Sequence, residues 1–358
     1  MRYGYRSDLP FGEGSAVSWD LDPAVIGSWR SVRPAGALPH LAEEVDAAAP
    51  INEHEVLIDV DLLHVDATSF GQIARECDAD PSRMAARIAE IVSARGTLQN
   101  PVTGSGGVAR GRVLEVGASS RAGVAIGQLV VPLVSLIALP LALDEVGPVD
   151  PGTPEVPVRG RAVVTGRMPV LRVPDDLADC ALTAADVYPV ASYAYERARP
   201  GDHVVVLGAG MAGMLAAVAA HEAVGVDGVV TVADVSVDAL ARIAAAVPDA
   251  VTLECDARDA VATATALRDR GLRPADLTLA CTSARGCEGT ALLVTASTGT
   301  VLFFSTATSF AAAALGSDPL GTAARLELSN GVTPDHGERT LDLLRRHPLL
   351  RTAFSSHP

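Results

Sequence analysis

One stretch of the chain, His203 to Gly225, joins an apolar run, a glycine-rich turn and an alanine-rich segment without a spare residue. The run Val204 to Leu207 is apolar throughout, as a parallel strand buried on both faces is. Gly208, Gly210 and Gly213 follow as G-x-G-x-x-G. These glycines permit a tight turn, close approach of the backbone to a pyrophosphate, and close packing of helix on strand. The stretch therefore predicts a strand, a phosphate-binding turn and a helix.

A second apolar segment, 228–234, ends in Asp234 at the spacing that a dinucleotide fingerprint requires. A carboxylate there accepts hydrogen bonds from a ribose diol and repels a 2′-phosphate, so the pattern favours NAD over NADP. Met211 and Ala212, at the start of the predicted helix, complete the predicted turn site. A glycine turn in an unrelated α/β fold stays open as an alternative, because G-x-G-x-x-G alone is a weak signal.

Further strand candidates lie near residues 250–256, 276–283 and 300–305, separated by helical segments such as 236–247 and 259–270. This alternation predicts a parallel, doubly wound sheet, in which ligands bind beyond the carboxyl ends of the strands. Strand 324–332 and helix 336–350 complete it. Cofactor contacts are therefore expected at polar residues that end strands, although such residues also cap turns: Thr282, Ser283 and Ser305.

The first half of the chain has strand-like patterns of a different kind. Residues 53–67 alternate apolar and polar, and further strands are expected at 111–117, 127–136, 161–166 and 170–176. They predict a small, mostly antiparallel barrel. A polar loop is expected at 68–72, a helix at 81–95 and another at 177–197. The glycines of 96–107 serve a turn, because a strand and no helix follows them.

The length of 358 residues suggests two domains. We expect a β-rich domain at 1–178, a Rossmann domain at 179–335, and a C-terminal helix at 336–358 that returns to the domain interface. Residues 1–33, which include Trp19 and Trp29, lack periodicity. They form either an arm packed on a partner or over a cleft, or a floppy terminus.

Composition narrows the class of function. The net charge of −15 and a pI near 4.9 argue against nucleic acid or an anionic membrane as a partner. The sequence contains no lysine, which excludes a Schiff-base lysine and a P-loop. Its five cysteines form no C-x-x-C pair, and this favours reduced thiols in the cytoplasm. No signal peptide opens the chain, and the apolar run 129–143 is too short to span a bilayer.

A β-rich first domain followed by a Rossmann domain resembles the medium-chain dehydrogenase/reductase superfamily, whose first domain is GroES-like. Residues 55–70 look like its first barrel strand and the loop after it, and 111–117 with 127–131 look like a later strand pair. Zinc-dependent members carry a cysteine where this chain has Asp66, and a histidine where it has Ser105 or Gly107. Catalytic zinc needs three protein ligands and an open position, so the resemblance implies a zinc-independent member without a metal.

Within that superfamily the chain is most similar to the L-erythro-3,5-diaminohexanoate dehydrogenase family. Three stretches carry the resemblance: GTLQNPVTGSGG at 96–107, HVDATSFGQI at 64–73 and SNGVTPDHGERTLDLLR at 329–345. It implies NAD-dependent oxidative deamination of a small diamino or β-amino acid to the 3-oxo acid, ammonia and NADH, or the reverse, by a homodimer. The chain departs from the family in a longer N-terminal arm and in Arg110, where the pattern is apolar.

The resemblance also implies site residues. Without zinc, a carboxylate must take the ammonium proton and activate water. Asp66 is the first candidate base, Asp186 the second, and Ser105 joins them as a catalytic candidate. Polar contacts to the second amine and the carboxylate are expected from the residues around Asp66 and from the glycine-rich loop, although Asn100 and Thr103 could instead stabilise that loop: Ser69, Gln72, Asn100, Thr103 and Ser105. His64 and Tyr188 are secondary, since packing explains both.

Two other functions remain open at this point. A zinc-free quinone or enoyl reductase would share the fold, use NADPH and need no carboxylate, and Asp234 argues against it. A dinucleotide-binding scaffold without catalysis would need none of the polar residues of 64–73 and 96–107. The presence of those residues favours an enzyme.

Overall fold

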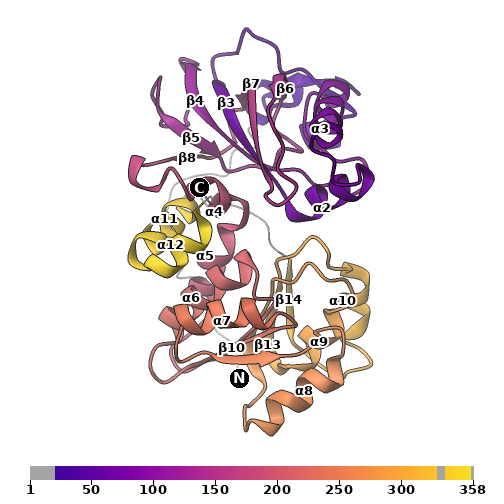
Figure 1. The fold of residues 1–358 in the computed structure, drawn as a ribbon, viewed down its shortest axis with the longest axis vertical. Helices are drawn as coiled ribbons and strands as arrows, with labels where there is room; N and C mark the ends of the chain where they lie inside the picture. Colours follow the sequence, from indigo (N-terminus) through magenta and orange to yellow (C-terminus); the bar gives the residue numbers. More distant parts are fainter. Residues whose placement is uncertain (1–20, 329–334, 356–358) are drawn as a thin grey trace.

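The protein, described here by a computed structural model for residues 21–328 and 335–355, contains two six-stranded sheets and one small two-stranded sheet. In Figure 1 the first six-stranded sheet, drawn in indigo to magenta, lies above the second. Helices α11 and α12, in yellow, lie beside α4 and α5 where the two halves meet. The molecule thus has two halves with a bridge of helices at one side.

The first large sheet is antiparallel, with the strand order β6-β7-β3-β4-β5-β8. In β3, Ile58 and Val60 are buried while Asp59 and Asp61 are exposed, which confirms the predicted alternation. The sheet packs its apolar face on helix α3. The elements are β3 (Val56–Val65), β4 (Gly107–Val116), β5 (Leu129–Pro132), β6 (Leu141–Val146), β7 (Glu155–Val164), β8 (Val170–Arg172) and α3 (Pro81–Arg95).

Residues 68–72, which the sequence analysis expected to form a polar loop, belong to helix α2 (Ala67–Glu76). That prediction was wrong. Asp66 caps the helix by accepting hydrogen bonds from the backbone N–H groups of Thr68 and Ser69. Phe70 and Ile73, three residues apart on one face, are buried in the core of the first half. Cap and packing together form a helix where the polar letters indicate a loop.

The second large sheet is parallel, with the strand order β11-β10-β9-β12-β13-β14. The order reverses between β9 and β12, and at such a point ligands bind beyond the carboxyl ends of the strands. The predicted Rossmann arrangement is confirmed. The strands are β9 (His203–Leu207), β10 (Val229–Asp234), β11 (Val251–Glu254), β12 (Ala275–Ala280), β13 (Thr295–Phe303) and β14 (Arg325–Leu328). Residues 329–334, which the predicted last strand would include, lie outside the described part.

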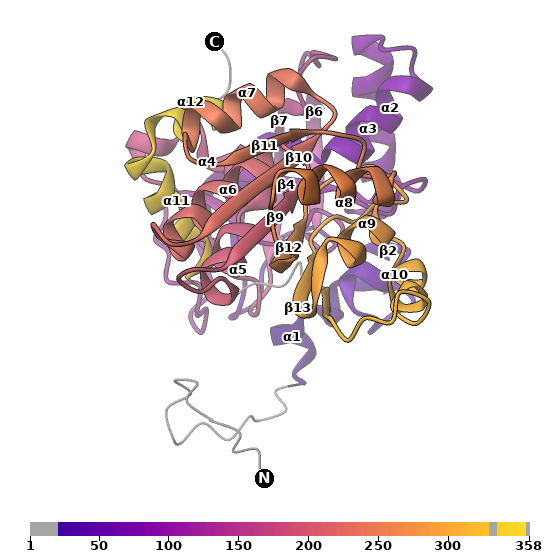
Figure 2. The same ribbon diagram turned by 90° about the horizontal axis from the view of Figure 1, so that it is seen from below.

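Helices cover both faces of this sheet, as Figure 2 shows. Val204 and Val206 of β9 belong to an apolar cluster with α6 and α7, whereas Val205 and Leu207 belong to a cluster with α8, α9 and α10. Such two-sided burial explains the unbroken apolar run. The helices are α6 (Met211–Val224), α7 (Val237–Ala246), α8 (Ala260–Asp269), α9 (Glu288–Leu293) and α10 (Phe310–Gly316).

The predicted helix 177–197 is two helices, so its boundaries were wrong. A 3₁₀ turn (Asp175–Leu177) precedes α4 (Ala181–Val187), and α5 (Pro189–Arg197) starts at a proline. Pro189 has no N–H to continue the hydrogen bonding of α4, and proline at the first position of a helix is favourable. The helical hydrogen bonding is therefore interrupted at Tyr188.

Two C-terminal helices, α11 (His336–Arg346) and α12 (Pro348–Phe354), pack against α4, α5 and α6. Thr340 donates a hydrogen bond of 3.0 Å to the carbonyl of Tyr188. A Cβ at Gly337 would lie 2.9 Å from Leu133 in the first half, so α11 approaches that half closely. The C-terminal helices thus contact both halves.

The start of the described chain is held by a buried ion pair. Arg30 and Glu55, 1% and 0% exposed, lie 2.7 Å apart, and the Trp29 indole donates to the same carboxylate. Short elements surround it: α1 (Pro23–Ile26), a 3₁₀ turn (Ser28–Arg30), β1 (Ser31–Arg33), a 3₁₀ turn (Pro39–Leu41) and β2 (Glu44–Val45). Residues 21–33 therefore pack on the first half. Trp19 and the rest of the predicted arm lie outside the described residues.

We propose the domain limits 1–178, 179–335 and 336–358, since the antiparallel sheet ends at β8 and α4 leads toward the parallel sheet. Across the described ranges, we find no helix with both the length and the apolar character that crossing a membrane requires.

Candidate active site

The glycine turn connects β9 to α6, and each glycine has a distinct structural role. Gly208 has φ +101°, a conformation that other residues rarely adopt. A Cβ at Gly213 would lie 1.8 Å from the carbonyl oxygen of Gly208, so α6 can pack on the turn only with glycine there. At Gly210 a Cβ would meet no described atom within 4 Å and would enter open space. That space is where a pyrophosphate would approach the backbone.

The N-terminus of α6 also fits a phosphate-binding site. Gly210 is its N-cap and has no side chain to occupy the free N–H groups of the first turn. Those groups can therefore bind an anion. Met211, Ala212 and Gly210 line the larger of the two cavities described below. The turn fits the pyrophosphate of a dinucleotide.

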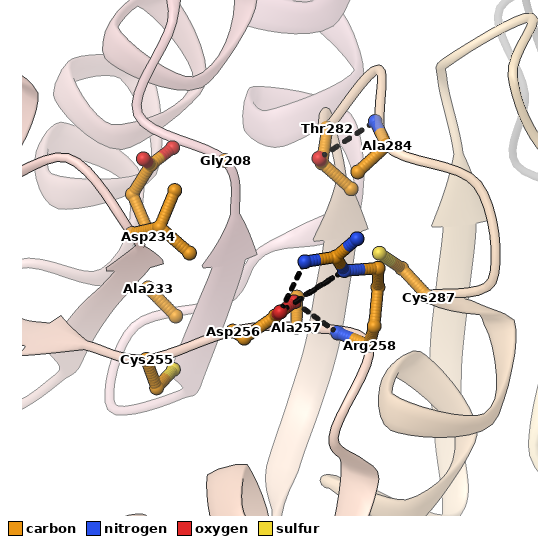
Figure 3. A pocket seen from close by; sticks show the side chains of 11 residues that line it. Gly208, Ala233, Asp234, Cys255, Asp256, Ala257, Arg258, Thr282, Ala284 and Cys287 are labelled. Carbon is orange, nitrogen blue, oxygen red and sulfur yellow. Dashed lines mark hydrogen bonds and ion pairs between the residues drawn. The ribbon is translucent and has the colours of Figure 1, made fainter.

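Asp234, at the end of β10, lies beside the turn (Figure 3). Its Oδ2 accepts a hydrogen bond of 2.7 Å from Ala209 N, and its Oδ1 accepts one of 2.8 Å from Ser236 N. Each carboxylate oxygen keeps a second lone pair for a ribose hydroxyl. The carboxylate lies in a hollow of about 260 Å³ whose lining residues include Gly208, Asp234, Asp256, Arg258, Thr282 and Cys287.

Arg258 and Asp256 form an ion pair in this hollow (Figure 3). The Arg258 Nε donates to Asp256 Oδ1 at 2.9 Å, and the hydrogen bonds from Arg258 lower the pKa of Asp256 to about 2. The positive charge of the Arg258 guanidinium is thus already paired with the Asp256 carboxylate.

The three strand-end residues predicted as cofactor contacts lie at the carboxyl edge of the parallel sheet. Thr282 lines the small hollow, while Ser283 and Ser305 line the large cavity. The hydroxyls of Thr282 and Ser305 accept hydrogen bonds from Ala284 N and Ala307 N. They therefore cap local turns and can still donate a hydrogen bond to a ligand.

A cavity of about 700 Å³ lies between the two halves. It continues from the glycine turn toward the end of β3 and the face of α4. Its polar and C-terminal lining residues include His64, Asp66, Thr68, Ser105, Glu155, Thr183, Asp186, Tyr188, Cys281, Ser283, Ser305, Phe354 and Ser355. The predicted catalytic residues and the glycine turn thus border one space.

Asp66 anchors a cluster of hydroxyls at one wall. Its Oδ1 accepts from Ser69 N at 3.0 Å and from Ser105 Oγ at 3.1 Å. The Ser69 hydroxyl lies 2.7 Å from both Thr103 Oγ1 and Ser105 Oγ. Asp66 Oδ2 is buried and has no partner among the described atoms. Ser105 and Asp66 line the cavity, whereas Ser69 and Thr103 lie behind them.

Gln72 and Asn100 lie farther from the cavity. The Asn100 amide donates to Gln72 Oε1 at 2.8 Å, and the Gln72 amide donates to Glu76 at 2.7 Å. Asn100 Oδ1 also accepts from Val102 N. These bonds fix α2 against the loop 96–107, and neither side chain is among the described lining residues.

Asp186 faces the cavity from α4, with 21% of its side chain exposed. Burial, and then the negative charge of Asp66, raise the pKa of Asp186 to about 7. His64 Nε2 lies 3.8 Å from Asp186 Oδ2. Burial lowers the pKa of His64 to about 4, although the charges of Glu155 and Asp66 oppose this. Near pH 7 the histidine is therefore neutral and the Asp186 carboxyl can exchange a proton.

Tyr188 lines the cavity at the break between α4 and α5. Burial raises the pKa of its phenol above the usual range, and the hydroxyl donates to the Leu133 carbonyl at 3.5 Å. The phenol therefore keeps its proton at neutral pH. Arg110, the residue that departs from the family pattern, is not among the lining residues of the described chain; it pairs with Asp61 at 3.0 Å.

Comparison with known proteins decides the family. A family model described as the L-erythro-3,5-diaminohexanoate dehydrogenase N-terminal domain matches residues 29–174. An L-erythro-3,5-diaminohexanoate dehydrogenase from Acetoanaerobium sticklandii is 34% identical over 333 residues, which cover 92% of this chain and 97% of the relative. The chain belongs to the L-erythro-3,5-diaminohexanoate dehydrogenase family. A Fusobacterium nucleatum protein of the same name is likewise 34% identical, over 340 residues that cover 92% of this chain and 97% of that relative.

Solved structures place this diaminohexanoate dehydrogenase family member in the medium-chain dehydrogenase fold. The CurK enoyl reductase superposes with a TM-score of 0.56 at 13% identity, covering 88% of this chain and 85% of that one. An alcohol dehydrogenase from Thermotoga maritima gives a TM-score of 0.54 at 16% identity, covering 86% of each chain. At these identities the likeness shows the fold alone. Membership of the diaminohexanoate dehydrogenase family makes the chain an oxidoreductase that uses a nicotinamide dinucleotide.

No group of three or more His, Cys, Asp or Glu residues that could hold a metal ion occurs within residues 21–328 and 335–355. Sequence reasoning missed several lining residues of this dehydrogenase, among them Glu155, Thr183 and Phe354. Glu155 starts β7 opposite His64 of β3, and only the strand register brings it to the cavity. An acid at the start of the strand that pairs with β3 is a signal that correct pairing of the strands could have identified.

Proposed function

We propose that the chain catalyses the NAD-dependent oxidative deamination of a small 3,5-diamino acid, or the reverse reductive amination. The charge of the cavity carries this proposal: Asp66, Glu155 and Asp186 line it, and none of its described lining residues is an arginine. Such a space attracts a ligand with two ammonium groups. The family to which the chain belongs supports the same substrate class.

In the proposed reaction the amine-bearing carbon loses a hydride to the dinucleotide, which supplies the two-electron acceptor. The ammonium must first lose a proton, and the resulting imine then takes up water and releases ammonia. One ammonium substrate, one NAD⁺ and one water give the ketone, ammonium, NADH and one proton. Side chains must therefore accept a proton twice, once from the ammonium and once from the attacking water.

We propose Asp186 as this general base. A base works best when its pKa lies near the operating pH, and burial raises the pKa of Asp186 to about 7. The neighbouring imidazole of His64 is neutral, so it adds no positive charge that would hold Asp186 in its charged form. Asp186 takes the proton while the carboxylate becomes neutral, which its buried position favours.

We propose that Asp66 acts through its charge and not as the base. Its Oδ1 is occupied as the cap of α2 and as the acceptor of the Ser105 hydroxyl. Its charge contributes to the raised pKa of Asp186 and attracts the substrate ammonium. Ser105 lies at the cavity wall with its hydroxyl oriented by Asp66, where it can hold the attacking water. We therefore propose Asp186 and not Asp66 as the base, whereas the sequence makes Asp66 the first candidate.

NAD is the proposed dinucleotide. The Asp234 carboxylate beside Gly208 suits a ribose diol and repels a 2′-phosphate. Arg258, the guanidinium in the same hollow, is engaged by Asp256. We further propose a homodimer in the cytoplasm: Leu328 on the sheet-edge strand β14 is 54% exposed, and the five cysteines are free thiols.

A substrate screen tests the function. Diamino and β-amino acids are offered with NAD⁺ or NADP⁺, and NADH absorbance and ammonia are measured together, before and after dialysis against a chelator. We expect equimolar NADH and ammonia from a 3,5-diamino acid, with NAD⁺ preferred and no loss after chelation. NADPH-dependent reduction of a quinone or enone, without any deamination, would replace the proposal with the reductase alternative. Size-exclusion chromatography with light scattering checks the dimer.

A further inference from the structure

The large cavity is lined by a third carboxylate, Glu155, that the proposed reaction does not use. Glu155 lies opposite His64 in the antiparallel pairing of β7 with β3, and both line the cavity. Thr183 donates a hydrogen bond of 3.0 Å to Glu155 Oε1. Thr183 and Asp186 lie three residues apart on α4, hence on one face of that helix. Asp186 and Glu155 therefore both lie near His64.

This arrangement places two carboxylates around one uncharged ring. His64 Nε2 lies 3.8 Å from Asp186 Oδ2, and directly opposite residues of an antiparallel pair have Cβ atoms roughly 5 Å apart. The pKa of His64 is lowered to about 4, chiefly by burial, so the ring adds no positive charge that could neutralise them. Two neighbouring anionic positions thus face the same space.

We propose that Glu155 binds the second, non-reacting ammonium of the substrate and so selects diamino acids over simple β-amino acids. The proposal rests on the proposed function. In a 3,5-diamino acid one methylene separates the two amine-bearing carbons, so both ammonium groups can meet neighbouring carboxylates. One lies at Asp186 for proton transfer and the other at Glu155 for binding. A β-amino acid has no second ammonium, so it leaves the charge of Glu155 without a partner in the substrate.

Glu155→Gln tests the proposal. Glutamine keeps the size and the acceptor for Thr183 but loses the charge. We expect kcat/KM for 3,5-diaminohexanoate to fall about 10- to 100-fold, the size of a hydrogen bond to a charged group, while that for 3-aminohexanoate stays the same or rises. The limb of the pH profile near pH 7 should persist, because Asp186 and not Glu155 is the base. The control Glu115→Gln removes an exposed carboxylate of β4 and should leave kcat/KM for both substrates unchanged.

Competitive inhibition gives a second measurement that requires no turnover of the inhibitor. 1,3-Diaminopropane should bind more tightly than propylamine to the wild-type enzyme, and Glu155→Gln should remove this difference. Equal losses for both substrates, or an unchanged preference for the diamine, would overturn the role of Glu155. Wild-type enzyme that deaminates neither substrate would instead overturn the proposed function. A thermal melt of each variant identifies any loss that comes from misfolding.

Discussion

The pKa of Asp186 is raised to about 7 by its burial and, secondarily, by the negative charge of Asp66 in the wall of the same cavity. The two carboxylates belong to elements far apart in the sequence, the N-cap of α2 and the C-terminal end of α4. Their roles are therefore coupled: a change at Asp66 alters the pH at which Asp186 accepts a proton.

Asp186→Asn removes the proposed base. The amide cannot take a proton, so we expect kcat for deamination to fall by about 10²–10⁴. In the wild type, deamination should rise as the pH rises through about 7, because Asp186 must be unprotonated to accept the ammonium proton. Steady-state rates against pH check both points. A variant with wild-type rates and the same limb near pH 7 would assign the base to another residue.

Asp66→Asn separates capping from charge. Asparagine caps a helix about as well as aspartate, so the melting temperature should stay close to that of the wild type. The loss of charge removes one cause of the raised pKa of Asp186, and the limb of the pH profile should move to lower pH. Asp80→Asn, which changes the cap of α3, is the matched control. Turnover lower by orders of magnitude at every pH would make Asp66 the base.

Asp66→Ala removes the cap as well as the charge, because alanine cannot accept the hydrogen bonds from Thr68 N and Ser69 N. Loss of such a cap costs about 1 kcal/mol. The melting temperature should therefore drop for this variant and not for Asp66→Asn. Equal stabilities, measured by thermal or urea unfolding, would contradict the capping role.

Asp234→Ala should weaken NADH binding more than NADPH binding. The substitution removes the acceptor for the ribose diol and the charge that repels a 2′-phosphate. It also removes the hydrogen bond to Ala209 N, a loss that both cofactors share. Fluorescence titration with NADH and NADPH measures the ratio. Asp238→Ala, an exposed change on α7, should leave it unaltered. A proportional loss for both cofactors would place Asp234 away from the ribose.

Alanine at Gly210 and at Gly213 should have opposite effects on folding and binding. At Gly213 the new Cβ would lie 1.8 Å from the Gly208 carbonyl, and such overpacking costs about 1–3 kcal/mol. At Gly210 it would enter open space, so the variant should melt like the wild type but bind NADH weakly. Thermal melts paired with NADH titration compare them. Normal NADH affinity for Gly210→Ala would show that the pyrophosphate does not approach there.

Local patterns in the sequence predicted the dinucleotide half well. The turn from Gly208 to Gly213 and the acid Asp234 depend on spacing within short segments, and the structure has the predicted strand, turn and helix there. The alternation in β3 and the amphipathic pattern of α3 were equally local. Helix α2 was missed because polar side chains dominate its first turn, and its stability comes from the Asp66 cap and two buried residues.

The substrate half could be predicted only in part. Asp66, Ser105 and Asp186 were proposed by resemblance, and all three line the cavity. Glu155 and Phe354 were missed, because their place depends on the register of β7 against β3 and on the return of α12 to the first half. Such long-range pairing leaves little trace in the local pattern. Gln72 and Asn100 were expected to contact the substrate, but their amide groups hydrogen-bond to each other outside the cavity lining.

The cavity wall is shared among segments from nearly the whole described chain, and this affects how fragments of the family should be interpreted. Residues 29–174, which carry the family signature, contain Asp66 and Glu155 but not Asp186, the glycine turn or Phe354. A truncated gene product that retained only this region would still be recognised by its sequence, yet it would lack the proposed base and the hydride acceptor's binding site. Sequence surveys that count the signature alone would therefore overestimate the number of functional enzymes.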